Sequence, residues 1–211
     1  MFHTFSTKNF YRICDKLAAS DKDLAAIIAK HGYSPMWTRP NTYETLVHII
    51  LEQQVSLASA LAALKKLQEH TKGISPAKIL TLTDEEMRAC YVSRQKAMYI
   101  RGLAEAIKEE KIKLQDFGQM SNDEARAQLI TLKGIGNWTI DVYLMFVLQR
   151  ADIFPMGDLA AVNALKKVKH LAKDIPREQL SKITEQWKPY RTVATMLLWH
   201  DYLSSPFKSK Q

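Results

Sequence analysis

The stretch around Gly134 and Gly136 has the composition of a turn that binds phosphate. Glycine permits a tight, left-handed backbone and leaves no side chain in the way of a ligand. A helix that begins directly after such a turn points its first amides, and the positive end of its dipole, at the ligand. Lys133 adds a positive charge beside the turn, and Ile135 is apolar enough to plug between two helices. We therefore predict an anion site that suits a DNA phosphate.

A single carboxylate, Asp158, follows the next expected helix and a turn that contains Pro155 and Gly157. Pro and Gly make this turn rigid, and an apolar helix is expected over residues 159–168. Aspartate is a favoured N-cap residue, so capping alone accounts for its position. Spacing by itself favours that capping role over a chemical one.

Two adjacent amides, Gln53 and Gln54, interrupt an apolar stripe within residues 42–67. The stripe has helical spacing and consists of Leu46, Ile50, Leu57, Leu61 and Leu64. The interruption indicates that the helix breaks there or faces something polar. A core glutamine bonded to the backbone explains it equally well.

The elements that must position these residues are helices. Stretches such as residues 57–67 and 96–108 are rich in Ala, Leu, Lys and Glu, which are strong helix formers. A capping residue followed three positions later by Glu marks helix starts at Asn41, Thr83 and Ser121. Helices are also expected at residues 7–19, 21–30, 138–148 and, opened by a proline, 190–202. Alternating strand patterns are scarce, so we predict an all-α protein with about nine or ten helices.

Composition narrows the functional classes. The chain has 30 Lys and Arg against 22 Asp and Glu, a net charge of +8, which favours a polyanionic partner. Two cysteines cannot supply the four thiolates of an iron–sulfur cluster. The six histidines lack ligand-like spacing, so no catalytic metal is expected. No signal core or bilayer-length apolar run is visible, so we expect a cytoplasmic protein without a membrane partner, associated with the nucleoid if bacterial.

In combination, the motifs resemble the helix-hairpin-helix (HhH-GPD) DNA glycosylase superfamily, which is named for its hairpin, its Gly/Pro-rich loop and its Asp. Residues 132–139, followed by Phe154-Pro155-x-x-Asp158, look like its signature. Residues 49–56 are similar to its Gln-x-x-Ser helix, and residues 93–97 to the start of a later core helix. Residues 187–191 and 196–202 resemble the last helix of the alkylbase branch, that of 3-methyladenine DNA glycosylase II. The resemblance covers roughly residues 42–202.

The resemblance implies an architecture of two helical lobes, with the active site in the cleft between them. The whole chain, residues 1–211, would form one glycosylase unit, with the hairpin at about 122–149. The N-terminal helices within residues 1–40 would pack with the C-terminal helices within 159–203. About 40 residues precede the resemblance, too few for the N-terminal sheet domain of some members.

The resemblance also implies a reaction. Asp158 becomes the catalytic carboxylate that faces the sugar of a flipped nucleotide, where it stabilises positive charge and helps to orient water. Bifunctional relatives carry a nucleophilic lysine two residues after the second hairpin glycine, where this chain has Trp138. An indole cannot form a Schiff base, so a monofunctional enzyme that leaves an abasic site is expected. Gly157 replaces a second acid that is frequent in the family, which puts only the tuning of Asp158 in doubt.

The remaining site residues follow from the same match. Trp138 and Trp199 occupy pocket positions of the alkylbase branch, with Tyr143 as a weaker candidate, although tryptophans on helices commonly lie in the core. An electron-rich pocket would select a cationic, alkylated base. Gln54 matches the residue that fills the gap left by the flipped base. The predicted DNA contacts are Lys133, Gly134, Ile135, Gly136, Thr139, Gln53 and Gln54.

We therefore expect a monomer that acts on double-stranded DNA with damaged bases, with 3-methyladenine and 7-methylguanine as the substrate class. Two alternatives remain open: a glycosylase for a deaminated or mismatched base, and a non-catalytic DNA-binding protein that uses only the hairpin. A helical interaction scaffold fits the composition but leaves the Gly-x-Gly turn unexplained. The family resemblance also leaves room for a monovalent cation held by hairpin carbonyls, with no other cofactor.

Overall fold

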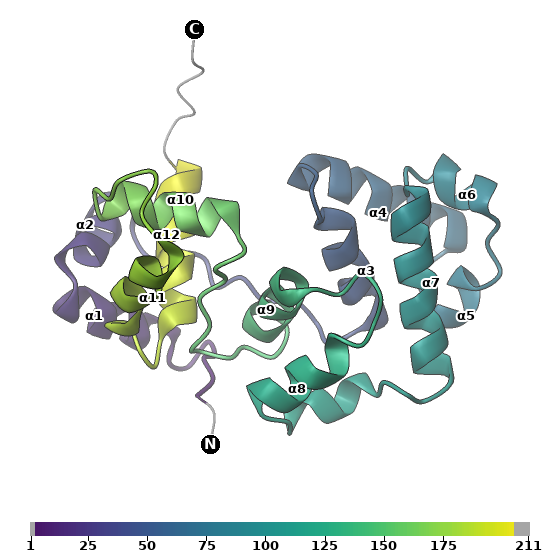
Figure 1. Ribbon diagram of the computed structural model, residues 1–211, viewed down its shortest axis with the longest axis horizontal. Coiled ribbons are helices and arrows are strands. Elements are labelled where there is room, and N and C mark those ends of the chain that lie inside the picture. Colours follow the sequence, from purple (N-terminus) through teal and green to yellow (C-terminus); the bar gives the residue numbers. More distant parts are fainter. Residues whose placement is uncertain (1–2, 205–211) are drawn as a thin grey trace, which may run out of the picture. The chain divides into compact units, whose positions relative to one another are not determined.

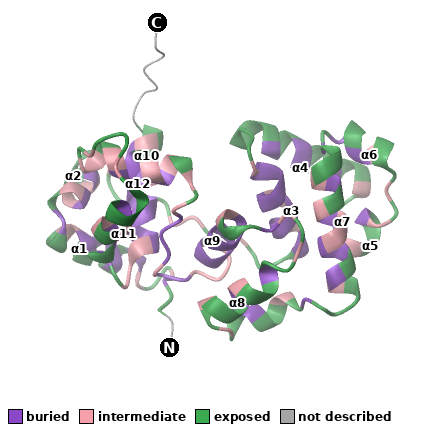
Figure 2. Ribbon diagram, viewed as in Figure 1, coloured by how far each residue is buried: buried purple, intermediate pink, exposed green. Residues whose placement is uncertain are grey.

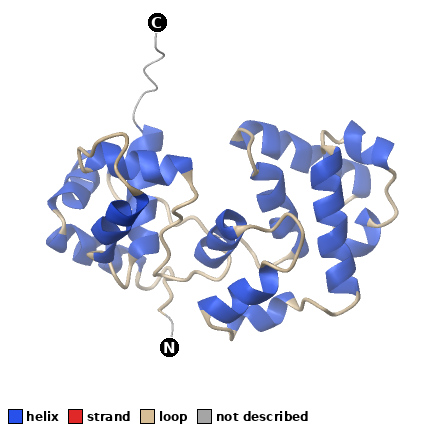
Figure 3. Cartoon of the chain, viewed as in Figure 1, coloured by secondary structure: helices blue, strands red, loops and turns tan. Residues whose placement is uncertain are grey.

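The computed structural model describes residues 3–204, and within that range it is built from helices (Figures 1 and 3). This confirms the predicted all-α class. Between residues 3 and 204, β structure is limited to an isolated bridge between Thr4 and Arg150. The helices are α1 (Phe10–Ser20), α2 (Lys22–His31), α3 (Tyr43–Glu52), α4 (Leu57–Thr71), α5 (Pro76–Ile79), α6 (Asp84–Ala89), α7 (Arg94–Lys108), the 3-10 helix η1 (Leu114–Gly118), α8 (Asn122–Leu129), α9 (Asn137–Phe146), α10 (Leu159–Val168), α11 (Arg177–Glu185) and α12 (Arg191–Ser204).

The chain divides into two compact units, which are described separately. Unit 1 comprises residues 1–38 and 144–211, and unit 2 comprises residues 39–143. In unit 1, helices α1, α2 and α10 each pack against α12, so the first and last helices of the chain share one core. In unit 2, α3 packs against α4 and α7, and α5 and α6 pack against α7. Both units show buried helix faces toward their own cores (Figure 2).

Local capping chemistry sets several helix starts. Thr83 with Glu86, and Ser121 with Glu124, form complete capping boxes, as their spacing predicts. The predicted cap at Asn41 is wrong, because the N-cap of α3 is Thr42, whose hydroxyl accepts a hydrogen bond from the amide of Thr45. The side chain of Asn41 instead finds partners outside the helix. It donates to the Leu114 carbonyl at 2.7 Å and accepts from the Tyr143 hydroxyl at 2.7 Å.

A buried ion pair holds the core of unit 1 together. The ammonium of Lys169 lies 2.7 and 2.6 Å from the two carboxylate oxygens of Asp21, and the indole N–H of Trp187 donates to Asp21 at 2.7 Å. Asp21 is also the N-cap of α2. Burial raises the pKa of Asp21, but the hydrogen bonds from Lys169 and Trp187 outweigh burial, so its pKa lies below the ordinary value.

We expect Lys169→Met to destabilise the protein by about 3–5 kcal/mol at pH 7, because it leaves the buried carboxylate of Asp21 without its cation. In the wild type the folded-state pKa of Asp21 is lowered. The pair's contribution is therefore complete above the unfolded pKa of about 3.9 and is lost as pH falls through the folded value. The difference between wild type and variant should thus shrink below about pH 4.

Urea unfolding at neutral and acidic pH, followed by tryptophan fluorescence, measures this difference. Lys173→Met is the matched control, because Lys173 is an exposed lysine a few residues away in the same unit. It should change the free energy of unfolding by less than about 0.5 kcal/mol. A Lys169→Met effect that stays constant with pH would contradict the assigned role of Asp21.

Candidate functional site

The predicted hairpin is present in unit 2, where a turn joins α8 to α9. Gly134 adopts the left-handed conformation expected for it, with a φ of 85°. The amide of Ile135 donates to the carbonyl of Leu132 at 3.0 Å, and the Ile135 side chain is only 3% exposed. Lys133 and Gly136 are both exposed. The turn thus plugs its isoleucine into the unit and presents Lys133 and the Gly136 backbone, at the start of α9, to solvent.

Gly134 is also required by close packing. A Cβ atom at this position would lie 2.1 Å from Cγ of Tyr99, whose ring comes from α7. The same construction at Gly136 meets nothing within 4 Å. The two glycines therefore have different roles. A side chain at Gly134 would overlap the Tyr99 ring, whereas the space beside the Gly136 backbone is open. Sequence reasoning did not identify Tyr99, because no local signal marks its contact with the turn.

Gln53 braces this turn from the C-terminal end of α3. Its side-chain amide donates to the Gly134 carbonyl at 2.8 Å and to the Thr139 hydroxyl at 2.9 Å, and Thr139 is 2% exposed. Gln53 and Thr139, both predicted to contact DNA, therefore use these groups to hold the hairpin, as in the backbone-bonded alternative for Gln53. Gln54 is exposed and has a φ of 57°, so it projects from the turn between α3 and α4. Its predicted role as the gap-filling residue stays a prediction.

We expect Gln53→Ala to lower stability by about 1–3 kcal/mol, since the substitution leaves the partly buried Gly134 carbonyl and Thr139 hydroxyl without this donor. Amide hydrogen exchange should show the loss of protection concentrated at the hairpin. Gln54→Ala is the matched control, because its side chain is exposed, and it should leave hairpin protection unchanged. Equal exchange in the Gln53→Ala variant and the wild type would argue against the brace.

An arginine joins the two helices of the hairpin. Arg126, on α8, donates to the side chain of Asn137 at 2.9 Å and forms an ion pair with Asp141, both on α9. Asp141 is buried, with 8% of its surface exposed. This clamp holds the turn between its helices. Sequence reasoning missed it, although opposite charges on the two helices that flank the predicted turn were an available signal.

Asp158, in unit 1, caps α10 and contacts a tryptophan. Its Oδ1 atom accepts hydrogen bonds from the Ala161 amide at 2.7 Å and from the Trp199 indole N–H at 3.4 Å. Its own amide donates to the Pro155 carbonyl at 2.8 Å, which closes the Pro/Gly turn. The predicted N-cap position is confirmed. The capping bond and the indole bond hold the carboxylate in one orientation at the partly exposed start of the helix.

Aromatic rings surround Trp199 in the same unit. The ring of Phe146 lies 5.6 Å from Trp199, tilted by 37°, and Trp37 meets it edge-on at 6.4 Å. All three rings are half-buried. The structure thus packs Trp37 and Phe146 against Trp199, whose indole contacts Asp158. These residues come from three separate segments of the chain, so their association has no local signature.

The two other predicted pocket residues belong to unit 2. Trp138 is half-buried in the first turn of α9. Tyr143 has 0% exposure, donates from its hydroxyl to Asn41 and packs edge-on against Phe117 at 5.8 Å. The structure therefore places Tyr143 in the core of unit 2 and not at a surface that a base could reach. The physical reason is that its ring completes the packing between α9 and η1.

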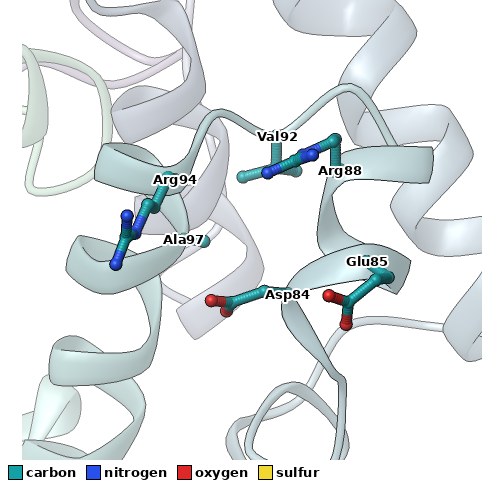
Figure 4. A pocket seen from close by; sticks show the side chains of 6 residues that line it. All are labelled: Asp84, Glu85, Arg88, Val92, Arg94 and Ala97. Carbon is teal, nitrogen blue, oxygen red and sulfur yellow. The ribbon is translucent and has the colours of Figure 1, made fainter.

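Two hollows in unit 2 lie beside the α6–α7 turn, and the first of them also borders the α3–α4 turn. One, of about 300 Å³, is lined by Val55, Tyr91 and Lys96 among others. The ammonium of Lys96 donates to the Leu51 carbonyl at 2.7 Å, and burial lowers the pKa of this lysine. The other hollow, of about 210 Å³, has mixed charge and contains no predicted site residue (Figure 4). Its lining is Asp84, Glu85, Arg88, Val92, Arg94 and Ala97.

The described part of the chain contains neither a cluster of metal ligands nor a membrane-spanning helix. Residues 3–204 contain no cluster of three or more His, Cys, Asp or Glu side chains placed to hold a metal ion. None of the helices described here is both long and apolar enough to cross a membrane.

Comparison with known proteins identifies the class. Residues 47–189 match the family model described as HhH-GPD superfamily base excision DNA repair protein. The chain therefore belongs to this superfamily, as its motifs predict.

Individual relatives carry names that are more specific than the name of the superfamily. The chain is 27% identical over 188 residues to a putative DNA-3-methyladenine glycosylase of Bacillus subtilis, a match that covers 85% of this chain and 66% of that protein. It is 29% identical over 182 residues to DNA-3-methyladenine glycosylase 1 of Schizosaccharomyces pombe, covering 84% of this chain and 80% of the relative.

Solved structures of 3-methyladenine glycosylases are similar to this chain. The S. pombe 3-methyladenine DNA glycosylase in complex with abasic DNA has a TM-score of 0.81 and 27% identity, over 89% of this chain and 95% of that one. A DNA-3-methyladenine glycosidase from Bacillus halodurans has a TM-score of 0.77 and 26% identity, over 97% and 93% of the two chains.

Proposed function

We propose that this protein is a monofunctional DNA glycosylase that hydrolyses the N-glycosidic bond of alkylated purines in duplex DNA and leaves an abasic site. The observation that carries the proposal is the carboxylate of Asp158 at the start of α10, bonded to the indole of Trp199 beside two further aromatic rings. The relatives named as 3-methyladenine DNA glycosylases, one of them solved with abasic DNA, support it.

The role of Asp158 follows from the charge of the reaction. Departure of the base leaves positive charge on the sugar, and a fixed carboxylate stabilises that charge without having to reorganise. The hydrogen bonds from Ala161 and Trp199 supply this fixed orientation. The same carboxylate would orient the water that attacks the sugar.

The aromatic cluster accounts for the choice of base. Alkylation of a ring nitrogen gives a purine a positive charge, and the face of a tryptophan attracts cations within about 6 Å. Trp199, with Phe146 and Trp37 as its neighbours, is the group of rings that we propose to line the base pocket. A cationic purine is already a good leaving group, so the site needs little general acid catalysis. A base of the 3-methyladenine and 7-methylguanine class fits these demands.

In this proposal the hairpin binds the DNA backbone. The charge of Lys133 and the exposed backbone at Gly136 suit a phosphate, and Gln54 would fill the gap left by the flipped base. The carbonyls of Leu132 and Gly134 each accept an internal hydrogen bond, and a carbonyl oxygen has two lone pairs. They are therefore compatible with the predicted monovalent cation, which stays a prediction.

The test is release of bases from methylated duplex DNA, analysed by chromatography. We expect free methylated purines and abasic strands that stay intact until alkali is added. Borohydride should trap no protein–DNA adduct, because the hairpin has Trp138 where a Schiff-base lysine would stand. Release of uracil or a mismatched base instead would favour the other lesion class. Tight DNA binding with no release from any lesion would favour the non-catalytic alternative.

A further inference from the structure

An exposed pair of tyrosines lies on the outer face of α1 in unit 1. Tyr11 is 57% exposed and Tyr33 is 43% exposed, with their ring centroids 4.9 Å apart and their planes at 53°. The opposite face of α1 is buried in the core of the unit. Exposed hydrophobic residues scattered singly need no explanation. Here two large rings instead lie against each other on one surface.

The rings are held in place and are not loose side chains. The hydroxyl of Tyr33 donates to the Asp15 carboxylate at 2.7 Å, one helical turn after Tyr11. Tyr11 and Asp15 are four residues apart, so they share one face of α1. This arrangement fixes Tyr33, which follows α2 in the chain, against Tyr11. The result is a preformed aromatic platform that would lose little side-chain entropy on binding.

Positive charge lies beside this platform. Lys8 and Arg12 are exposed near the face of α1 that carries Tyr11. Lys16 is also exposed, but its ammonium lies over the ring of Tyr190, 5.8 Å from the ring centroid. The one carboxylate among them, Asp15, already accepts the hydrogen bond from Tyr33. Basic and acidic residues nearly balance over residues 39–143, so almost all of the net charge of +8 belongs to the sequence of unit 1. A partner for this surface is therefore a polyanion that also has flat, apolar faces.

We propose that this surface, formed by Tyr11, Tyr33, Lys8 and Arg12, binds single-stranded DNA. Unpaired bases expose the π faces that stack on tyrosine, whereas the bases of a duplex are stacked on one another. The two cations would contact the phosphates between stacked bases. This surface shares no residue with the hairpin or with the residues around Asp158. It would let the enzyme hold unpaired strand that adjoins the duplex on which it acts.

The experiment uses the full chain and a 20-nucleotide oligothymidylate that contains 5-iododeoxyuridine. Irradiation should crosslink the oligonucleotide to Tyr11 or Tyr33, located by mass spectrometry, because this photochemistry favours stacked aromatic rings. Fluorescence anisotropy with the same oligonucleotide should show that Tyr11→Ala with Tyr33→Ala weakens binding at least tenfold. Arg12→Glu should reduce the slope of log affinity against log salt by about 0.7 for each phosphate that the arginine neutralises in the wild type.

Two controls separate stacking from other effects. Tyr11→Phe with Tyr33→Phe keeps both rings and should bind within about threefold of the wild type. Lys182→Glu makes the same kind of charge change as Arg12→Glu on α11 of the same unit, away from α1 in the sequence, and should leave the salt slope unchanged. Wild-type affinity in the double alanine variant, equal losses in the alanine and phenylalanine variants, or crosslinks confined to the hairpin would each overturn the proposal. None of these outcomes depends on base release, which is measured separately on methylated duplex.

Discussion

Asp158→Asn should lower the single-turnover rate of base release from methylated duplex DNA by about a thousandfold, while the protein stays folded. Loss of one preorganised electrostatic group in an active site typically costs a factor of about 100–1,000, and here the group would oppose the full charge of the sugar. Asparagine is as good an N-cap as aspartate, so the hydrogen bond to the Ala161 amide survives. The thermal midpoint should therefore change little.

The comparison needs saturating enzyme, because removal of a negative charge also strengthens binding to DNA. Asp158→Ala separates the two roles of the residue, because it removes the N-cap as well as the charge. It should lose activity as Asp158→Asn does, and it should also lower the free energy of unfolding by about 1 kcal/mol. If the asparagine variant keeps its rate within tenfold of wild type, Asp158 acts only as a cap, and the proposed chemistry fails.

Gly134→Ala should destabilise unit 2 by about 2–5 kcal/mol and weaken DNA binding at least tenfold. The substitution would place a residue with a Cβ atom at a φ of 85°. Its methyl group would overlap the Tyr99 ring and lie 2.1 Å from Cγ of Tyr99. A left-handed backbone costs a residue with a Cβ about 1–2 kcal/mol, and overpacking adds about 1–3 kcal/mol. Chemical unfolding and binding to a duplex that contains an abasic-site analogue measure the two effects.

Gly136→Ala is the matched control for this prediction. A Cβ at Gly136 meets nothing within 4 Å, so stability should fall by no more than about 1 kcal/mol. DNA affinity should still fall, because the methyl occupies the space through which a phosphate approaches the backbone. Adding Tyr99→Ala to Gly134→Ala should recover the steric part of the loss, as judged by a double-mutant cycle. Equal destabilisation by both glycine substitutions would contradict the different roles assigned to them.

The sequence by itself determined the features that depend on a few neighbouring residues. The all-α class, the hairpin turn with its left-handed glycine, the capping boxes at Thr83 and Ser121, and the N-cap position of Asp158 were all predictable. Each rests on helical periodicity, glycine conformation or a cap that bonds an amide two or three residues away. Such interactions act within one turn of chain, so they leave a signature in the local sequence.

Tertiary structure decided which residues meet. The bond between Gln53 and the Gly134 carbonyl joins positions 81 apart, and that between Trp199 and Asp158 joins positions 41 apart. The same packing placed Tyr143 in a core and brought Trp37 beside Trp199. A side chain's exposure and its hydrogen-bond partners depend on how helices from distant segments pack, and no local pattern records that packing. For this reason the sequence located the hairpin and the carboxylate, while only the fold distinguished the residues that hold them from the residues that face solvent.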